Sequence, residues 1–116
     1  MQLKIAWLFL YSNMKQQKTL CVYILKCNDD SYYIGITNNV NLRFSQHSEG
    51  ISPTAYTFKR RPVILVHEEY YTDFLKAIAR EKQLKRWSRA KKEALISGNY
   101  EKLIALSKTH GSTSSP

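Results

Sequence analysis

The pattern of apolar and polar residues predicts a β-hairpin near the beginning of the folded part of the chain. Residues 20–26 (LCVYILK) and 32–37 (YYIGIT) are rich in the β-branched and aromatic residues that favour strands. The turn-forming residues Asn, Asp and Ser lie between them. These two segments therefore predict an antiparallel pair of strands joined by a tight loop.

The length of that loop decides which side chains share a face of the sheet, because directly opposed residues in an antiparallel pair point the same way. A two-residue loop would pair Tyr23 with Ile36 and place Tyr23 and Tyr33 on opposite faces. A three-residue loop, with Asp30 in the left-handed conformation, would pair Tyr23 with Gly35 and place both tyrosines on one face. In that register, the glycine would leave an open slot where a backbone or a ligand could approach.

Helical and strand periodicities predict the remaining elements. In order, we expect a short helix capped by one of Asn38, Asn39 and Asn41 and ending near His47, a strand over residues 63–70, a helix from about Asp73 to Arg86, a further helix that Gly98 ends, and a last amphipathic segment over residues 100–107. The order β-β-α-β-α-α predicts an α+β fold, in which helices flank a three-stranded, mostly antiparallel sheet.

The length of 116 residues fits one domain. The periodic pattern begins only at Thr19, so we expect residues 1–18 to form an extension outside the fold and residues 19–108 to form the domain. Residues 109–116 are rich in Ser and Thr and are expected to be a disordered tail.

The chain is strongly basic, with 18 Lys and Arg against 9 Asp and Glu and a net charge of +9. Such an excess indicates a polyanionic partner, either nucleic acid or an anionic membrane surface. The apolar run at residues 5–11 is far shorter than the roughly 20 residues of a membrane span, so we expect nucleic acid and no membrane. A membrane-surface or protein-interaction role for this run is the remaining alternative. Cys21 and Cys27 offer neither a zinc ribbon nor a disulfide framework, which is typical of a cytoplasmic protein.

Several side chains that can take part in catalysis lie on helix faces whose other residues are apolar and are expected to pack against the core. In the short helix, Arg43 and His47 lie on the stripe that also carries Val40 and Phe44. In the helix after the third strand, Glu81 has apolar neighbours on its stripe. An inward cation or carboxylate is costly unless an opposite charge or a metal ion compensates it.

Each of these residues also has an ordinary structural explanation. A tyrosine pair stabilises a hairpin, and a histidine on a short helix is usually structural. Arg43 could pair with Asp29 or Asp30, and Glu81 could pair with Arg43. The functional interpretation depends on the whole set, because hydroxyls, a cation, an imidazole and a carboxylate around one apolar floor are the groups that metal-assisted phosphodiester hydrolysis uses.

The hairpin resembles the two motifs of the GIY-YIG nuclease superfamily, in particular its small single-domain bacterial members of the YhbQ-like type. Residues 21–23 (CVY) stand at the first motif and keep only its tyrosine, Tyr23. The second motif is matched without change by Tyr33, Ile34 and Gly35. The similarity extends over residues 19–96 and includes the segment REKQLKRWSRAKKEALI at its end.

This resemblance implies an endonuclease that uses one Mg²⁺ or Mn²⁺ ion to hydrolyse phosphodiester bonds in DNA. The candidate catalytic residues are Tyr23, Tyr33, Arg43, His47 and Glu81. Glu81 would bind the metal ion, and Arg43 would clamp the non-bridging phosphate oxygens. Tyr23 would activate water with help from His47, and Tyr33 would orient the water or the phosphate.

The basic residues that would hold the nucleic acid are Lys59, Arg60, Arg61, Lys85, Arg86, Arg89, Lys91 and Lys92. No recognition helix or base-reading pattern is visible, so we expect low sequence specificity unless a partner protein supplies it. The expected role is in DNA repair or recombination. The rival interpretation is a non-catalytic nucleic-acid-binding module that keeps the fold, since many family nucleases carry an asparagine beyond the metal-binding glutamate, near the position of Glu93 here.

Overall fold

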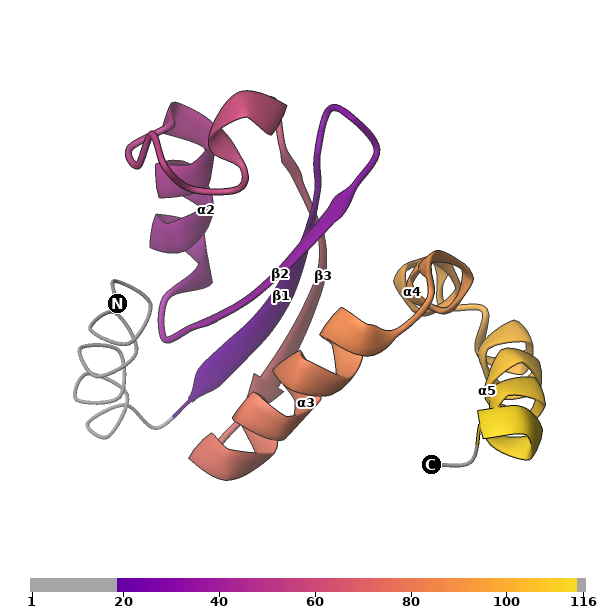
Figure 1. The fold of residues 1–116 in the computed structure, drawn as a ribbon. Helices are drawn as coiled ribbons and strands as arrows, with labels where there is room; N and C mark the ends of the chain where they lie inside the picture. Colours follow the sequence, from indigo (N-terminus) through magenta and orange to yellow (C-terminus); the bar gives the residue numbers. More distant parts are fainter. Residues whose placement is uncertain (1–18, 115–116) are drawn as a thin grey trace. The chain divides into compact units, whose positions relative to one another are not determined.

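The computed structural model describes residues 19–114, with side chains through Lys108, so the expected extension at residues 1–18 lies outside the described residues. The elements, in chain order, are β1 (Leu20–Lys26), β2 (Tyr32–Thr37), α2 (Val40–Glu49), the short 3-10 helix η1 (Phe58–Arg60), β3 (Ile64–Tyr71), α3 (Phe74–Arg86), α4 (Arg89–Ser97) and α5 (Tyr100–Ser114), as Figure 1 shows. The predicted α+β fold is confirmed. No helix among these residues is long and apolar enough to cross a membrane.

The three strands form one antiparallel sheet in the order β2-β1-β3. The central strand β1 is buried from Leu20 to Leu25, which explains why its sequence is almost continuously apolar rather than alternating. Its side chains alternate between two faces of the sheet, and each face is covered by a helix.

The register of the hairpin is the one that a three-residue loop predicts. Tyr23 pairs with Gly35 and Leu25 pairs with Tyr33, so both tyrosines lie on one face. The loop closes because Asp30 adopts a positive φ of 67° and donates its N–H to the carbonyl oxygen of Cys27 at 2.9 Å. Asp tolerates this left-handed conformation better than most residues do.

The open slot that we expected opposite Tyr23 is filled by Tyr23 itself. A Cβ built on Gly35 would meet the Cε1 atom of the Tyr23 ring at 2.9 Å and would come still closer to its Cζ and Oη atoms. The ring lies flat over the glycine because no side chain at position 35 keeps it away. The glycine therefore positions a catalytic candidate and does not open a path for a ligand.

The helices α2 and α3 cover opposite faces of the sheet (Figure 1). On the first face, Tyr23 and Leu25 pack with Val40 and Phe44 of α2. On the second face, Glu69 of β3 lies beside Val22 and accepts two hydrogen bonds from Arg80 of α3, at 2.8 and 2.9 Å. This bidentate ion pair fixes the first part of α3 against the sheet.

Side-chain caps begin α2, α3 and α4, the first two at residues near which the sequence predicted a helix start. Asn39 accepts the N–H of Leu42 at 3.0 Å and begins α2, and Asp73 accepts the N–H of Leu75 at 2.9 Å and begins α3. Ser88 begins α4, which ends at Gly98 in the left-handed conformation, as predicted. Such caps satisfy N–H groups that the helix itself leaves without a partner.

The described chain divides into two compact units, and the boundary lies between Lys82 and Gln83, within α3. In the second unit, α5 is longer than the segment expected over residues 100–107, because its backbone stays helical to Ser114. A helix that has already nucleated adds polar residues at little cost, which accounts for the extension.

Replacing Gly35 by Ala should lower the free energy of unfolding by about 1–3 kcal/mol, because the Tyr23 ring must leave its place over the glycine. Urea denaturation of Gly35→Ala measures this cost. In a Tyr23→Ala background the same substitution should cost nothing, because alanine is otherwise preferred to glycine in a strand. An equal cost in both backgrounds would show that the ring is not the cause.

The ion pair between Glu69 and Arg80 should make the free energy of unfolding depend on pH in the acidic range. Burial alone would raise the pKa of Glu69, but hydrogen bonds from His67, Arg80 and Tyr71 outweigh it and hold this pKa well below its usual 4.5. A depressed carboxyl pKa stabilises the folded state above the unfolded-state pKa, and this contribution is lost as the pH falls below it.

We therefore expect Arg80→Gln to lose about 1–3 kcal/mol at pH 7 and to show a smaller further loss between pH 5 and pH 2 than the unmutated protein. Urea denaturation across this pH range is the measurement. Lys82→Gln, an exposed substitution on the same helix with the same change in charge, is the control. Parallel stability curves for Arg80→Gln and the unmutated protein would contradict the assignment.

Candidate active site

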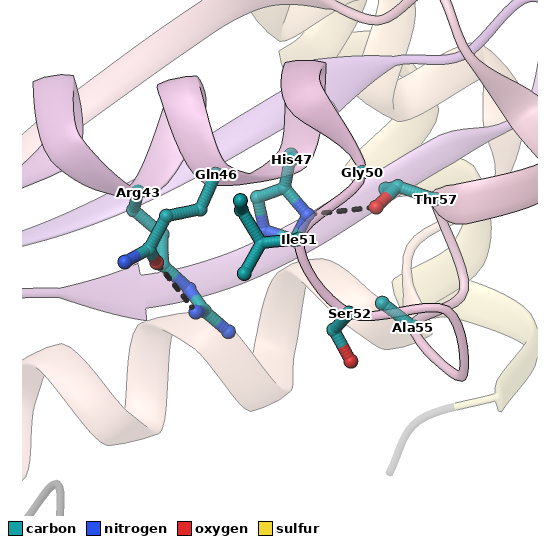
Figure 2. A pocket seen from close by; sticks show the side chains of 8 residues that line it. All are labelled: Arg43, Gln46, His47, Gly50, Ile51, Ser52, Ala55 and Thr57. Carbon is teal, nitrogen blue, oxygen red and sulfur yellow. Dashed lines mark hydrogen bonds between the residues drawn. The ribbon is translucent and has the colours of Figure 1, made fainter.

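The candidate site is built on α2 and on the loop that follows it. Arg43 and His47 lie one turn apart on α2, where Arg43 is exposed and His47 is buried. Both line a cavity of about 310 Å³, shown in Figure 2. The other lining residues are Gln46, Gly50, Ile51, Ser52, Ala55 and Thr57. Gly50, in the left-handed conformation, ends α2 and turns the chain into this loop.

The hairpin contributes the two tyrosines to the same place. The Oη atom of Tyr23 lies 3.2 Å from Nε2 of His47, within hydrogen-bonding distance. The Tyr33 ring centre lies 5.0 Å from that of His47 and 6.3 Å from that of Tyr23. The three rings form one aromatic cluster between β1, β2 and α2.

The other ring nitrogen of His47 also has a partner. Its Nδ1 atom lies 2.7 Å from the hydroxyl oxygen of Thr57, and Thr57 is only 1% exposed (Figure 2). No sequence pattern predicts this contact, because Thr57 lies in a loop ten residues beyond the histidine. Only the fold of the loop brings it there.

Burial controls the protonation of this group of residues. It lowers the pKa of His47 to about 4, helped by the positive charge of Arg43, so the imidazole is neutral at pH 7. Burial also raises the pKa of Tyr23, an effect that the nearby Tyr33 increases and that the charge and hydrogen bond of Arg43 partly offset. Tyr23 therefore keeps its proton, and His47 is the neutral acceptor beside it.

Arg43 does not make the ordinary ion pair that its position allowed. Asp29 pairs with Arg60 at 3.0 Å and Asp30 pairs with Lys26 at 3.7 Å. The Arg43 guanidinium instead donates to the side-chain oxygen of Gln46 at 3.1 Å, at the mouth of the cavity (Figure 2). A neutral amide partner leaves the cationic charge of Arg43 available to an anion.

Glu81 is placed differently from the other four candidates. It is 7% exposed and lies on α3, which covers the opposite face of the sheet from α2. The structure thus brings together Tyr23, Tyr33, Arg43 and His47, while Glu81 lies in the other layer. Among residues 19–114, no group of three or more His, Cys, Asp and Glu side chains could hold a metal ion by itself.

Of the three basic candidates of the first unit, Arg60 lies next to the aromatic cluster. Tyr56 stacks on Tyr33 with ring centres 6.0 Å apart, and the Arg60 guanidinium lies 3.8 Å above the Tyr56 ring. Arg61 packs over Phe58 and donates to its carbonyl oxygen, whereas Lys59 is exposed. Arg60 and Arg61 therefore have structural contacts in addition to any contact with a ligand.

The basic candidates of the second unit lie on the end of α3 and on α4. Lys85 and Arg86 are exposed, Lys91 lies 4.7 Å from the Trp87 ring centre, and burial lowers the pKa of Lys92. Arg89 pairs with Glu93 at 2.9 Å, one turn along α4. The residue near the position of the family asparagine is thus held in an exposed ion pair.

Comparisons with known proteins agree with this architecture. A family model described as the GIY-YIG catalytic domain matches residues 19–94. A UPF0213 protein of Syntrophus aciditrophicus is 43% identical over 82 residues, which cover 71% of this chain and 94% of that protein. A UPF0213 protein of Staphylococcus haemolyticus is 43% identical over 75 residues, covering 65% and 90%.

A solved structure is also similar in sequence. The solution NMR structure of a UPF0213 protein from Bacillus halodurans is 38% identical and covers 72% of this chain and 92% of that one, with a TM-score of 0.46. The family model spans the hairpin, α2, β3, α3 and most of α4, and therefore all five candidate catalytic residues. The chain belongs to the GIY-YIG family of nuclease domains, as a small member similar to the UPF0213 proteins.

Proposed function

We propose that this chain is an endonuclease that hydrolyses phosphodiester bonds in DNA, with low sequence specificity and with a divalent metal ion. The observation that carries the proposal is the buried hydrogen bond between Tyr23 and the neutral His47, beside the exposed cation of Arg43. Phosphodiester hydrolysis needs a proton acceptor for the attacking water and a cation for the phosphate, and this arrangement supplies both.

Tyr23 acts in this proposal as a hydroxyl that passes a proton on. In the free protein Tyr23 is 1% exposed, so the substrate must bring the attacking water to its hydroxyl. As the oxygen of that water attacks phosphorus, Tyr23 takes the water proton and gives its own proton to Nε2 of His47, while the leaving oxygen departs with the electron pair of its bond to phosphorus. Because the two transfers are coupled, no free phenolate forms. The raised pKa of Tyr23, which would make it a poor base by itself, is then no obstacle.

Binding of the substrate would make His47 a stronger base. A pKa of about 4 makes His47 a weak base in the free protein, and the charge of Arg43 is one of the two causes. A phosphate bound to the Arg43 guanidinium would neutralise that charge and raise the pKa of His47 toward the working pH. Tyr33, in ring contact with His47, would orient the phosphate or the water.

Glu81 is the residue that would hold the metal ion. Mg²⁺ usually keeps several waters and is bound by one or two carboxylates together with substrate oxygens, so a single buried carboxylate fits Mg²⁺ or Mn²⁺ better than an ion that needs a full protein cage. When bound, such an ion would neutralise charge on the leaving side of the phosphate. The proposal requires that one phosphodiester reach both the Arg43 guanidinium and the Glu81 carboxylate.

The exposed basic residues would bind the DNA backbone without reading its sequence. In the first unit these are Lys59 and the outer parts of Arg60 and Arg61. In the second unit they are the exposed Lys85, Arg86 and Arg89, together with the half-buried Lys91 and Lys92. Weak specificity of this kind suits cleavage directed by DNA structure, as in repair or recombination, or by a partner protein.

The proposal predicts Mg²⁺- or Mn²⁺-dependent nicking of branched or single-stranded DNA. Tyr23→Phe should lower kcat about 10²–10⁴-fold, because it removes the proton path while keeping the ring. Arg43→Gln and Glu81→Gln should also abolish most cleavage. Lys102→Gln, an exposed change of the same charge as Arg43→Gln on α5, is the control.

The same assay tests the rival function, a non-catalytic nucleic-acid-binding module. Binding of DNA by the unmutated protein without cleavage in either metal ion would favour the rival, which rests on Glu93 standing near the position of the family asparagine. Cleavage that survives in Tyr23→Phe would show that the proposed proton path is wrong.

The histidine should titrate far below its usual pKa of 6.5 in the free protein. Following the Cε1–H resonance of His47 by NMR, we expect a midpoint of about 4. In Arg43→Gln the midpoint should rise, because a neighbouring positive charge disfavours the imidazolium form and this variant removes that charge. Lys102→Gln should leave the midpoint in place. A midpoint near 6.5 in the unmutated protein would show that the imidazole is not buried as described.

A further inference from the structure

We propose that Thr57 is a positioning residue that selects the tautomer of His47 in which Nε2 can accept a proton from Tyr23. This inference rests on the proposed function, because the selected tautomer matters for catalysis only if His47 is the proton acceptor. The contact between Thr57 and His47, however, is a property of the folded chain that can be measured without any substrate.

The hydroxyl of Thr57 is held in one place by the fold of its loop. Thr57 is 1% exposed, and its carbonyl oxygen accepts the N–H of Arg60 at 3.0 Å, where η1 forms. The N–H of Phe58 bonds to the carbonyl oxygen of Ala55 at 3.1 Å. These backbone bonds on both sides present the Thr57 hydroxyl to Nδ1 of His47 at 2.7 Å.

The hydrogen-bond partners of Tyr23 show which way the protons point in the folded protein, and therefore which tautomer Thr57 holds by accepting Nδ1–H. A neutral imidazole carries one N–H, so only one ring nitrogen can donate. The Tyr23 hydroxyl is buried between Arg43, which can only donate, and Nε2 of His47. Its hydrogen is therefore satisfied if Nε2 accepts it, since leaving a buried hydroxyl without an acceptor is costly.

Once Nε2 is the acceptor, the ring proton must be on Nδ1, and Thr57 accepts it. The Thr57 hydroxyl then has its own hydrogen left to donate, and Thr57 lines the cavity of about 310 Å³ where water or a phosphate oxygen could accept it (Figure 2). Tyr23 does not line that cavity. In the reverse direction, Thr57 would donate to Nδ1 and the ring proton would be on Nε2. The hydroxyl hydrogen of the buried Tyr23 would then have no acceptor.

The consequence for the reaction is a fixed direction of proton flow. When Tyr23 passes its proton to Nε2, the ring becomes a cation and the bond from Nδ1–H to Thr57 becomes charge-assisted and stronger. Without an acceptor at position 57, the ring could place its proton on Nε2 and donate it to Tyr23. The proton from water would then have no acceptor.

The test compares Thr57→Val, which keeps the shape and removes the hydroxyl, with Thr57→Ser, which keeps the hydroxyl. In protein labelled with ¹⁵N, the ring nitrogen shifts of His47 at pH 7 report the tautomer directly. The unmutated protein and Thr57→Ser should show an unprotonated Nε2. Thr57→Val should shift the tautomer ratio toward Nε2–H by about tenfold, because a buried Nδ1–H beside valine would have no acceptor, whereas Nε2–H could still donate to the Tyr23 oxygen.

Cleavage kinetics give the second readout. Thr57→Val should lower kcat about 10²-fold with little change in KM, and Thr57→Ser should restore kcat. A merely structural role would change stability without moving the tautomer ratio. If Thr57→Val fails to fold, Thr57→Cys, with a weakly accepting sulfur of similar size, should move the ratio in the same direction.

An unchanged tautomer in folded Thr57→Val, or an Nε2–H tautomer in the unmutated protein, would overturn the inference. A tautomer that shifts as expected in a protein without nuclease activity would support the positioning role of Thr57 and count against the proposed function alone. The two ideas can therefore fail separately.

Discussion

The burial of one phenol governs the whole candidate site. Tyr23 lies in the central strand and is 1% exposed, so its hydroxyl needs a partner inside the protein. His47 provides that partner only as a neutral ring, and the same burial that shields Tyr23 lowers the pKa of His47 to about 4. The pair forms because α2 carries His47 over the hairpin, and Thr57 in the following loop contacts the other ring nitrogen.

The pair between Tyr23 and His47 forms only if the hairpin register turns Tyr23 toward α2. The register fixed by Asp30 puts Tyr23 opposite Gly35, and the missing side chain lets the ring lie close to the strand. Any other residue at position 35 would push the ring toward α2. The second motif of the family therefore has a steric meaning here, because its glycine makes room for the tyrosine of the first motif.

The helices and strands and the hairpin could be predicted from the sequence, because capping residues, turn residues and periodicity act over a few positions. The choice between two hairpin registers stayed open, since it depended on one φ angle at Asp30. Long-range features were beyond the sequence. It could not show that the Tyr23 ring fills the slot over Gly35, that Glu81 lies in the opposite layer, or that Thr57 contacts His47, because each depends on how separate elements pack.

The most direct test of the account is a crystal structure of the protein with Mn²⁺ and a short DNA carrying a sulfur-substituted, slowly cleaved phosphate. The account predicts that this phosphate binds the Arg43 guanidinium within reach of Tyr23, and that anomalous diffraction places manganese at the Glu81 carboxylate. DNA bound elsewhere on the surface, or manganese absent from Glu81 while the phosphate is in place, would contradict it.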